Sequence, residues 1–349
     1  MKNIFRFLII FSLLIFTTLP IYPKEIMVRF AAVGDVLLDR GIRKVMEKRG
    51  RDYPLQAVSD CLNWYDLAFC NLECPLSKLG KPMEKKYIFR GDPSNIEMLK
   101  KAGFNLFSLA NNHTLDYGRE ALIDTIDNLV NAGLYPIGAG KDHKKAMKPV
   151  IIEKNGISLA FFAALIFPME GVSGSSDLPG PCQPSIDELV SIIQDIRNQV
   201  DFIVVSFHWG FEYEPQPHPR QIEYAHRVIE AGADLIIGHH PHVMQGIEKY
   251  RGKYILYSLG NFLFDQHDDG GKQSFLFGCI LHDGNLLLPH IIPIEIVNYQ
   301  PCVATGEKAD FIASKIPLIS DEGVMFFRKE NGKYYLKEGS SHSSSMIIR

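Results

Sequence analysis

Apolar runs of strand length alternate with amphipathic stretches along the first two thirds of the chain. Each apolar run stops at a polar residue or a glycine, and a segment with the 3.6-residue period of a helix usually follows it. The pattern predicts strands at 26–33, 66–70, 104–109, 134–137, 201–207 and 233–237. It predicts helices at 40–48, 55–64, 94–102, 116–131, 185–199 and 219–231. Alternation of this kind is typical of α/β folds.

The other segments have the character of antiparallel strands. Asn155-Gly156 is a strong hairpin signal between predicted strands at 150–153 and 158–164. Segment 168–184 has the Gly, Ser and Pro content of a long loop, and periodicity is lost from Tyr299 onward. Further short strands are predicted at 247–250, 254–258, 274–282 and 286–296. We therefore expect one compact α/β (α+β) domain, a four-layer α/β/β/α sandwich of two mixed sheets covered by helices on both outer faces.

Polar residues of the type that bind ligands follow five of the predicted strands. They are Asp35, Glu73, Asn112-His113, His208 and the run Gly238-His239-His240-Pro241-His242. In open α/β sheets the ligand lies outside the carboxyl ends of the strands. Each residue alone has an ordinary structural explanation, such as a helix N-cap for Asp35 or a satisfied core histidine for His208. Because such explanations do not account for the shared location, we expect one site.

The donor atoms of this set favour divalent metal ions. Carboxylate and amide oxygens combined with neutral imidazole nitrogens suit Mn, Fe or Zn better than a thiolate cage does. We expect one or two ions of this type. If one carboxylate bridges two ions about 3.5–4 Å apart, the geometry suits in-line displacement at phosphorus.

The composition and the N-terminal sequence indicate which partners the protein binds and where in the cell it acts. The chain has 349 residues and a net charge of −3 with no basic face or arm, so we expect no nucleic-acid partner. Lys2 and Arg6 precede the apolar run Phe7–Leu19, as in a signal peptide, and the run is nearly long enough to span a bilayer. We expect residues 1–24 to be a signal peptide or an N-terminal membrane anchor; a buried core helix is the alternative. The protein would then be exported to the cell envelope, either membrane-anchored or secreted (periplasmic).

At this point the chain resembles a known family, the CapA family of poly-γ-glutamate capsule biosynthesis, a branch of the calcineurin-like metallophosphoesterases. The resemblance covers roughly residues 28 to 265 and lies in six ordered motifs. These are Val33-Gly34-Asp35-Val36-Leu37, Asn71-Leu72-Glu73-Cys74-Pro75-Leu76-Ser77, Leu109-Ala110-Asn111-Asn112-His113-Thr114-Leu115-Asp116-Tyr117-Gly118, Ser206-Phe207-His208-Trp209-Gly210, Gly238-His239-His240-Pro241-His242-Val243 and Tyr257-Ser258-Leu259-Gly260-Asn261-Phe262. The resemblance implies a metallophosphatase-like fold.

The resemblance also implies roles for single residues. It identifies the metal ligands as Asp35, the bridging Glu73, Asn112 and His208. The broader superfamily has a metal-binding His two residues after the aspartate, where this chain has Val36-Leu37. The last metal motif is normally Gly-His-x-His. His239 matches its first ligand, and the second is either His240 or His242.

Further candidate residues lie around the metal ligands. His113 resembles the histidine that protonates the leaving oxygen or stabilises the charge of the transition state. Asp116 either orients His113 or caps the following helix. His218 and Arg220 are candidate contacts to an anionic substrate, because Arg matches phosphate or carboxylate well, or else belong to a solvated loop. Asn261, which follows Gly260, is a candidate for supporting the substrate site.

Three functions are compatible with these residues. The first is an exported metal-dependent hydrolase-like protein, which the resemblance implies acts in the biosynthesis, export or anchoring of poly-γ-glutamate or a related anionic surface polymer. Its reaction would be metal-hydroxide attack on a phosphoester, or on an amide, with His113 as the acid. The second is a non-catalytic, membrane-tethered accessory subunit of a capsule-synthesis complex, and the third is an intracellular phosphatase. We expect the metallophosphatase-like domain at residues 25–300 and a C-terminal extension at 301–349.

Overall fold

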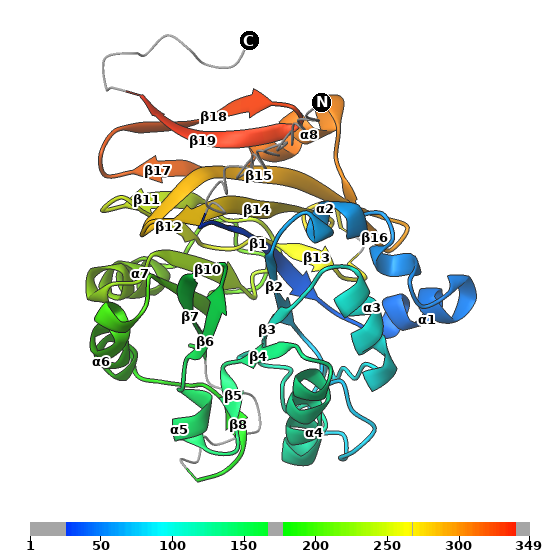
Figure 1. Cartoon of the computed structure of the whole chain (residues 1–349). Coiled ribbons are helices and arrows are strands. Elements are labelled where there is room, and N and C mark those ends of the chain that lie inside the picture. Colours follow the sequence, from blue (N-terminus) through cyan, green and yellow to red (C-terminus); the bar gives the residue numbers. More distant parts are fainter. Residues whose placement is uncertain (1–25, 167–176, 267, 340–349) are drawn as a thin grey trace, which may run out of the picture.

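The computed structural model describes residues 26–166, 177–266 and 268–339, whose strands form two large sheets and one small ribbon (Figure 1). The first sheet has the order β18 (Val324–Glu330), β19 (Lys333–Gly339), β15 (Asn285–Val297), β14 (Gln273–His282), β1 (Val28–Val36), β2 (Leu67–Leu72), β3 (Leu106–Ser108), β4 (Tyr135–Ile137), with β13 (Asn261–Leu263) beside β1 and β16 (Gln300–Val303) beside β15. The second has the order β17 (Leu318–Ser320), β11 (Ile247–Tyr250), β12 (Lys253–Leu256), β10 (Leu235–His239), β9 (Phe202–His208), β7 (Ile157–Leu165), β6 (Val150–Lys154). The ribbon pairs β5 (Ala139–Gly140) with β8 (Gly180–Pro181).

Helices cover the outer faces of the two sheets. They are α1 (Arg40–Arg49), α2 (Ser59–Asn63), α3 (Ile96–Lys101), α4 (Gly118–Asn131), α5 (His143–Ala146), α6 (Ile186–Ile196), α7 (Pro219–Ala231) and α8 (Gly306–Ser314). Figure 1 shows α6 and α7 on one side of the strands and α1, α3 and α4 on the other. Local sequence sets their ends: Ser185 and Glu188 form a capping box at the start of α6, and Gly232, with φ of 120°, ends α7.

The core lies where the two sheets pack against each other. The rings of Phe30 in β1 and Phe161 in β7 lie 6.0 Å apart, and Tyr254 in β12 lies 6.5 Å from Phe277 in β14. Every residue of β9 and β10 is buried, because these strands have a sheet partner on each side and layers above and below. The predicted fold, two mixed sheets between helical layers, is confirmed.

The carboxyl ends of the parallel strands in both sheets meet at one edge. In the first sheet β1 pairs in parallel with β2, and β2 with β3; in the second β9 pairs in parallel with β10. The register places Asp35 opposite Asn71 and His239 opposite His208. Polar residues that are far apart in the sequence are therefore brought together at this edge, as in other α/β sheets.

Some predicted boundaries were wrong. The first strand continues through Asp35 to Val36, because β13 and the carbonyl of Gly260 pair with its end. The predicted helix at 55–64 is a 3₁₀ turn, Tyr53–Leu55, followed by the short α2. The predicted N-terminal segment 1–24 and most of the loop 168–184 lie outside the described residues. Among the residues described, no helix combines the length and apolar character needed to cross a membrane.

The segment after residue 300 is part of both sheets up to Gly339. β19 pairs with β15, and β17 adds a parallel strand beside β11. The sequence pattern predicted no regular structure here. The strand β18 has mostly exposed side chains, so it shows no alternation of apolar and polar residues that would identify it.

Candidate metal centre

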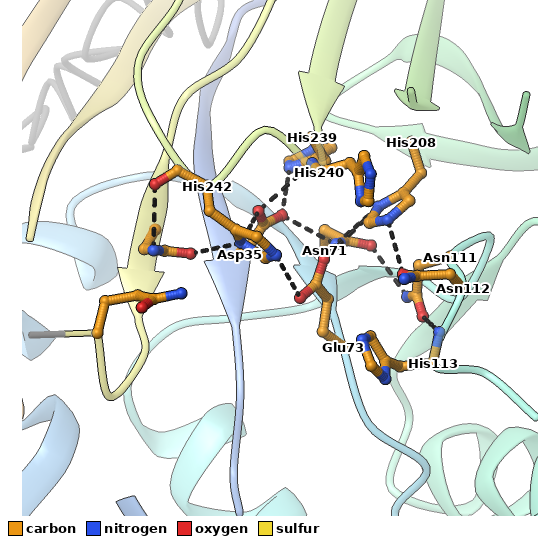
Figure 2. Close-up of polar contacts among 12 residues, drawn as sticks. Asp35, Asn71, Glu73, Asn111, Asn112, His113, His208, His239, His240 and His242 are labelled. Atoms are coloured by element: carbon orange, nitrogen blue, oxygen red, sulfur yellow. Dashed lines mark hydrogen bonds and ion pairs between the residues drawn. The ribbon is translucent and has the colours of Figure 1, made fainter. Parts of the chain in front are cut away.

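Two buried carboxylates lie at the centre of this edge. Asp35 and Glu73 are each 0% exposed, and the side chain of Asn71 lies between them (Figure 2). Asn71 Nδ2 is 2.9 Å from Asp35 Oδ1 and 3.1 Å from Glu73 Oε1. A single amide cannot neutralise two buried carboxylates, so the arrangement calls for cationic partners.

Imidazoles surround the two carboxylates. Asp35 Oδ1 lies 3.2 Å from His239 Nδ1, and Asp35 Oδ2 lies 3.3 Å from His242 Nδ1. Glu73 Oε1 lies 3.6 Å from His208 Nδ1, and Glu73 Oε2 lies 3.9 Å from His242 Nε2. His242, in the turn after β10, therefore faces both carboxylates, while His208 reaches Glu73 from β9 (Figure 2).

The ionisation of these groups is strongly perturbed. Burial, reinforced by the negative charge of Asp35, raises the pKa of Glu73 well above its usual range. Burial also acts to raise the pKa of Asp35, but hydrogen bonds from His239 and His242 hold that pKa well below its usual range. For His242, burial is opposed by Glu73 and Asp35, which raise its pKa to about 10. The site thus stabilises positive charge next to its carboxylates.

Two other histidines are held neutral. Burial, with a contribution from His240, lowers the pKa of His208 well below its usual range. Burial, with a contribution from His242, lowers the pKa of His240 to about 3. Neutral imidazole is the form that binds metals.

The residues present fit a divalent metal. Among the described side chains, the buried atoms Glu73 Oε2 and His239 Nε2 have no hydrogen-bond partner. Two sets of three side chains place their ligand atoms within 4.8 Å of one another, and these are Asp35, Glu73, His208 and Glu212, His240, His242. Their oxygen and nitrogen donors match Mn, Fe or Zn, the ions expected from the sequence. Neither set contains His239, whose Nδ1 faces Asp35.

The predicted ligand Asn112 lies beside the first set. Its Oδ1 is 3.0 Å from His208 Nε2, and its main-chain oxygen accepts a hydrogen bond of 2.8 Å from Lys85 Nζ. The neighbouring Asn111 fixes this turn, because it donates to Asn71 Oδ1 and accepts from the main-chain nitrogen of His113. The turn therefore brings Asn112 next to the donor atoms of the metal centre.

His113 and Asp116 form a buried pair next to the carboxylates. His113 Nδ1 lies 2.7 Å from Asp116 Oδ2, and the ring of Phe89 stacks on His113 with centroids 4.1 Å apart. Asp116 also accepts from Lys85 Nζ at 2.7 Å and from the main-chain nitrogen of Phe89 at 2.7 Å. Burial lowers the pKa of His113, although Asp116 opposes this shift. Of the two roles considered for Asp116, the contacts are those of a residue that orients His113.

The three predicted substrate residues have structural contacts. His218 caps α7, and its Nδ1 accepts a hydrogen bond of 3.2 Å from the main-chain nitrogen of the exposed Arg220. Asn261 is 0% exposed, and its Oδ1 lies 2.9 Å from His242 Nδ1. Asn261 therefore holds His242 in place, and the anion contacts of His218 and Arg220 stay predictions.

Sequence reasoning missed three residues of the centre. Asn71 stands at the end of β2, so its strand-end position was a usable signal. Glu212 and Lys85 lie in segments without regular structure, where a charged residue is expected on the surface for ordinary reasons. For these two residues the sequence pattern held no signal.

The sequence matches the family model described as "Bacterial capsule synthesis protein PGA_cap" over residues 29–266. That range contains both carboxylates, all of the imidazoles of the centre and the His113–Asp116 pair. The predicted resemblance to the CapA family is confirmed.

Curated relatives align over most of both chains. The "Capsule biosynthesis protein CapA" of Bacillus anthracis is 33% identical over 89% of this chain and 77% of its own length. The "PGA biosynthesis protein CapA" of Bacillus subtilis is 32% identical over 86% of this chain and 80% of its own. A Mycobacterium tuberculosis protein named "Probable polyglutamine synthesis accessory protein" is 29% identical over 73% of this chain and 72% of its own length.

Among solved structures, similarity is one of fold. A hypothetical protein from Thermus thermophilus superposes with a TM-score of 0.50 at 16% identity, covering 76% of this chain and 99% of that one. A 5'-nucleotidase precursor from the same organism superposes with a TM-score of 0.49 at 13% identity, covering 83% of this chain and 57% of that one.

Proposed function

The chain belongs to the bacterial capsule synthesis protein family PGA_cap, and we propose that it is an exported metal-dependent hydrolase acting on an anionic surface polymer. The names of its relatives from two Bacillus species supply the polymer class, poly-γ-glutamate or a related polyanion, and the step would be its biosynthesis, export or anchoring. Under this proposal the protein acts at the cell envelope, and residues 1–24 would serve as its export segment.

One observation carries the proposal. Asp35 and Glu73, both fully buried, share one amide and face imidazoles within 3.2–3.9 Å. Such a pair is costly for folding unless a cation compensates it, and it lies next to a histidine–carboxylate pair suited to proton transfer. A purely structural role explains neither the folding cost of the buried carboxylates nor their proximity to the His113–Asp116 pair.

Under this proposal, some residues bind the metal ion and others transfer a proton. A bound divalent ion would supply Lewis-acid stabilisation of negative charge on a phosphoryl or acyl oxygen and would activate water. Glu73, Asp35, His208 and Asn112 are the residues that would hold it. Asp116 fixes His113 with the proton on Nδ1, so Nε2 is the atom that transfers a proton to the leaving oxygen. Burial lowers the pKa of His113, which makes its protonated form a stronger acid.

A second candidate is a non-catalytic accessory subunit of a capsule-synthesis complex. This chain has Val36 and Leu37 where the superfamily has a metal-binding His, so the first motif offers Asp35 as a ligand and no histidine. The name of the M. tuberculosis relative also describes an accessory protein. Under this alternative the fold and an ion are kept without turnover.

Turnover by the full-length protein distinguishes the two. We expect the protein, purified in detergent and loaded with Mn²⁺, to hydrolyse bis-p-nitrophenyl phosphate or to shorten poly-γ-glutamate. His113→Asn should reduce the rate about a hundredfold or more, whereas His282→Asn, an exposed change on β14, should not. Metal-loaded protein that turns over neither substrate, with normal capsule in His113→Asn cells, would establish the accessory role instead.

A further inference from the structure

The metal centre and the start of β1 lie at opposite ends of the same strand. Asp35 lies near its carboxyl end and Val28 begins it, which separates the two by roughly 20–25 Å at about 3.3 Å per residue. The chain enters this strand from Ile26, the first of the described residues. The sequence predicts a signal peptide or membrane anchor at residues 1–24, and an anchor there would leave this end of the domain next to the bilayer.

Turns of both sheets hold the chain where it enters β1. Ile26 O lies 2.7 Å from Nδ1 of His282, which ends β14 beside the β14–β15 turn. Met27 O accepts a hydrogen bond of 2.9 Å from Nδ2 of Asn155 in the β6–β7 turn. The point where an anchor would join the domain therefore has a fixed place beside these two turns.

Two consecutive leucines that follow the β14–β15 turn both point outward. Leu287 and Leu288 are 41% and 50% exposed, although successive side chains of a strand ordinarily point to opposite faces. Leu288 has a φ of 49°, which is unfavourable for a bulky side chain, and the pairing of β14 with β15 shifts register here. Its carbonyl accepts a hydrogen bond of 2.9 Å from His290 Nδ1, which fixes the irregularity. An unfavourable backbone conformation is thus kept at a position where it exposes a second leucine.

A tryptophan between two cations lies on the same face of the sheet. The register aligns Leu287 with Ile280 and Ile280 with Arg29, so Leu287 and Arg29 share one face. The Arg29 guanidinium lies 5.0 Å and the Lys333 ammonium 4.3 Å from the ring of Trp64, which is 44% exposed. Tryptophan is enriched at the headgroup level of bilayers, and long cationic side chains there direct their charges toward water and phosphate.

We propose that the exposed apolar residues at this end of the domain form a bilayer-docking patch. They are Ile26, Trp64, Leu287 and Leu288. Single exposed apolar side chains are ordinary, but these gather where the chain enters the domain, and one of them requires an unfavourable backbone. The two leucines enter the acyl region and the indole lies among the headgroups.

Docking through this patch depends on apolar contacts more than on charge. Arg29 is paired with Asp66 at 3.0 Å, so its charge is largely compensated, and the association should change little with ionic strength. The docked domain turns its metal centre away from the bilayer. This orientation goes beyond the proposed function and holds for a hydrolase and for an accessory subunit alike.

Tryptophan fluorescence of the full-length protein tests the patch. The chain has two tryptophans, and the second, Trp209, is 0% exposed and follows His208 of the metal centre. In vesicles of phosphatidylglycerol and phosphatidylcholine brominated near the headgroup, we expect the bromines to quench Trp64, also at high salt. Trp64→Phe should show no quenching, which assigns the signal.

A pair of double variants separates docking from simple tethering by the N-terminal segment. Leu287→Ser with Leu288→Ser should lose the quenching. Leu79→Ser with Leu178→Ser changes two leucines of similar exposure outside the patch, 45% and 46%, and should be quenched like the wild type.

Three outcomes would overturn the patch. They are equal quenching in the two double variants, wild-type protein that floats with the vesicles without quenching, and wild-type protein that does not float with them. The second outcome would indicate a protein partner in place of lipid. Because no turnover is measured, each of them leaves the proposed hydrolase standing.

Discussion

Asn71 Nδ2 lies 2.9 Å from Asp35 Oδ1, and the two residues are register partners on the adjacent parallel strands β2 and β1. The same amide lies 3.1 Å from Glu73 Oε1, so one side chain positions both buried carboxylates. Asn71 in turn accepts from Asn111 Nδ2 at 3.1 Å, which orients the amide. The geometry of the metal centre therefore depends on a residue that need not touch the ion.

Replacing this residue tests its positioning role. Asn71→Ala should lower the affinity for Mn²⁺ about ten- to hundredfold, because both carboxylates lose the group that fixes their orientation. Titration of the full-length protein with Mn²⁺ measures the effect. Asn63→Ala, a change at an exposed asparagine of α2, is the control and should leave the affinity unchanged. Equal affinities in both variants would show that Asn71 has no part in the metal centre.

Lys85 supports the His113–Asp116 pair. Its side chain is 10% exposed, and its ammonium lies 2.7 Å from Asp116 Oδ1, whose side chain is 0% exposed. Lys85→Met should lower the free energy of unfolding by about 3 kcal/mol, because it leaves a buried carboxylate without its cation. It should also reduce kcat about tenfold as His113 loses its fixed orientation.

The matched variant is Lys86→Met. The Lys86 ammonium lies 5.0 Å from the ring of the exposed Tyr87, so its loss should change the free energy of unfolding by less than about 1 kcal/mol. Chemical denaturation of both variants gives the comparison. If Lys85→Met is as stable as Lys86→Met, the buried ion pair does not stabilise the fold.

His290 makes the stability depend on pH. Burial lowers its pKa to about 4, and the neutral ring accepts from the hydroxyl of Tyr65 at 3.0 Å and donates to Leu288 O at 2.9 Å. In the unfolded chain its pKa is about 6.5, so between about pH 6.5 and 4 the unfolded state binds more protons. The contribution of His290 is therefore complete above about pH 6.5 and declines as the pH falls toward 4, by about 2–3 kcal/mol in total.

His290→Gln removes this titration. The variant should be less stable than the wild type at about pH 7, and the difference in free energy of unfolding should shrink as the pH falls from about 6.5 to 4. Urea denaturation at several pH values measures both. A difference that stays constant across this range would show that His290 is not the group that titrates.

Two glycines bring the ligand-bearing strands close to neighbouring backbone. A Cβ added to Gly34, just before Asp35, would lie 1.7 Å from Gly260 O, and one added to Gly238, just before His239, would lie 1.9 Å from Tyr257 O. Gly34→Ala should therefore destabilise the protein by about 3 kcal/mol or more, as measured by thermal or urea unfolding. Gly180→Ala is the control: its nearest neighbour beyond the adjoining residues, an atom of Arg119, would be 3.6 Å away. Equal stability of the two variants would contradict this close packing.

The sequence pattern was sufficient for the layered fold and for most strand ends. Long apolar runs such as β7 and β9 are buried on both faces, so their strand character is local information. The site residues predicted from those runs, among them Asp35, Glu73 and His208, do meet in space. Their meeting depends on the parallel order of neighbouring strands, which the alternation of strands and helices already implies.

The features that the sequence pattern did not predict depend on tertiary contacts. Glu212 lies at the metal centre because the main-chain nitrogen of the next residue, Tyr213, donates a hydrogen bond to Pro241 O. Lys85 lies there because an irregular segment folds over His113. Neither contact leaves a periodic trace in the sequence. The strands β17 and β19 join the sheets through pairing with β11 and β15, so their structure follows from partners far away along the chain.

Anomalous diffraction from manganese-loaded crystals tests the metal centre most directly. We expect an anomalous peak among Asp35, Glu73 and His208, and its loss in a Glu73→Gln crystal. An ordered site that shows no peak among these three side chains, in protein saturated with Mn²⁺, would contradict the account.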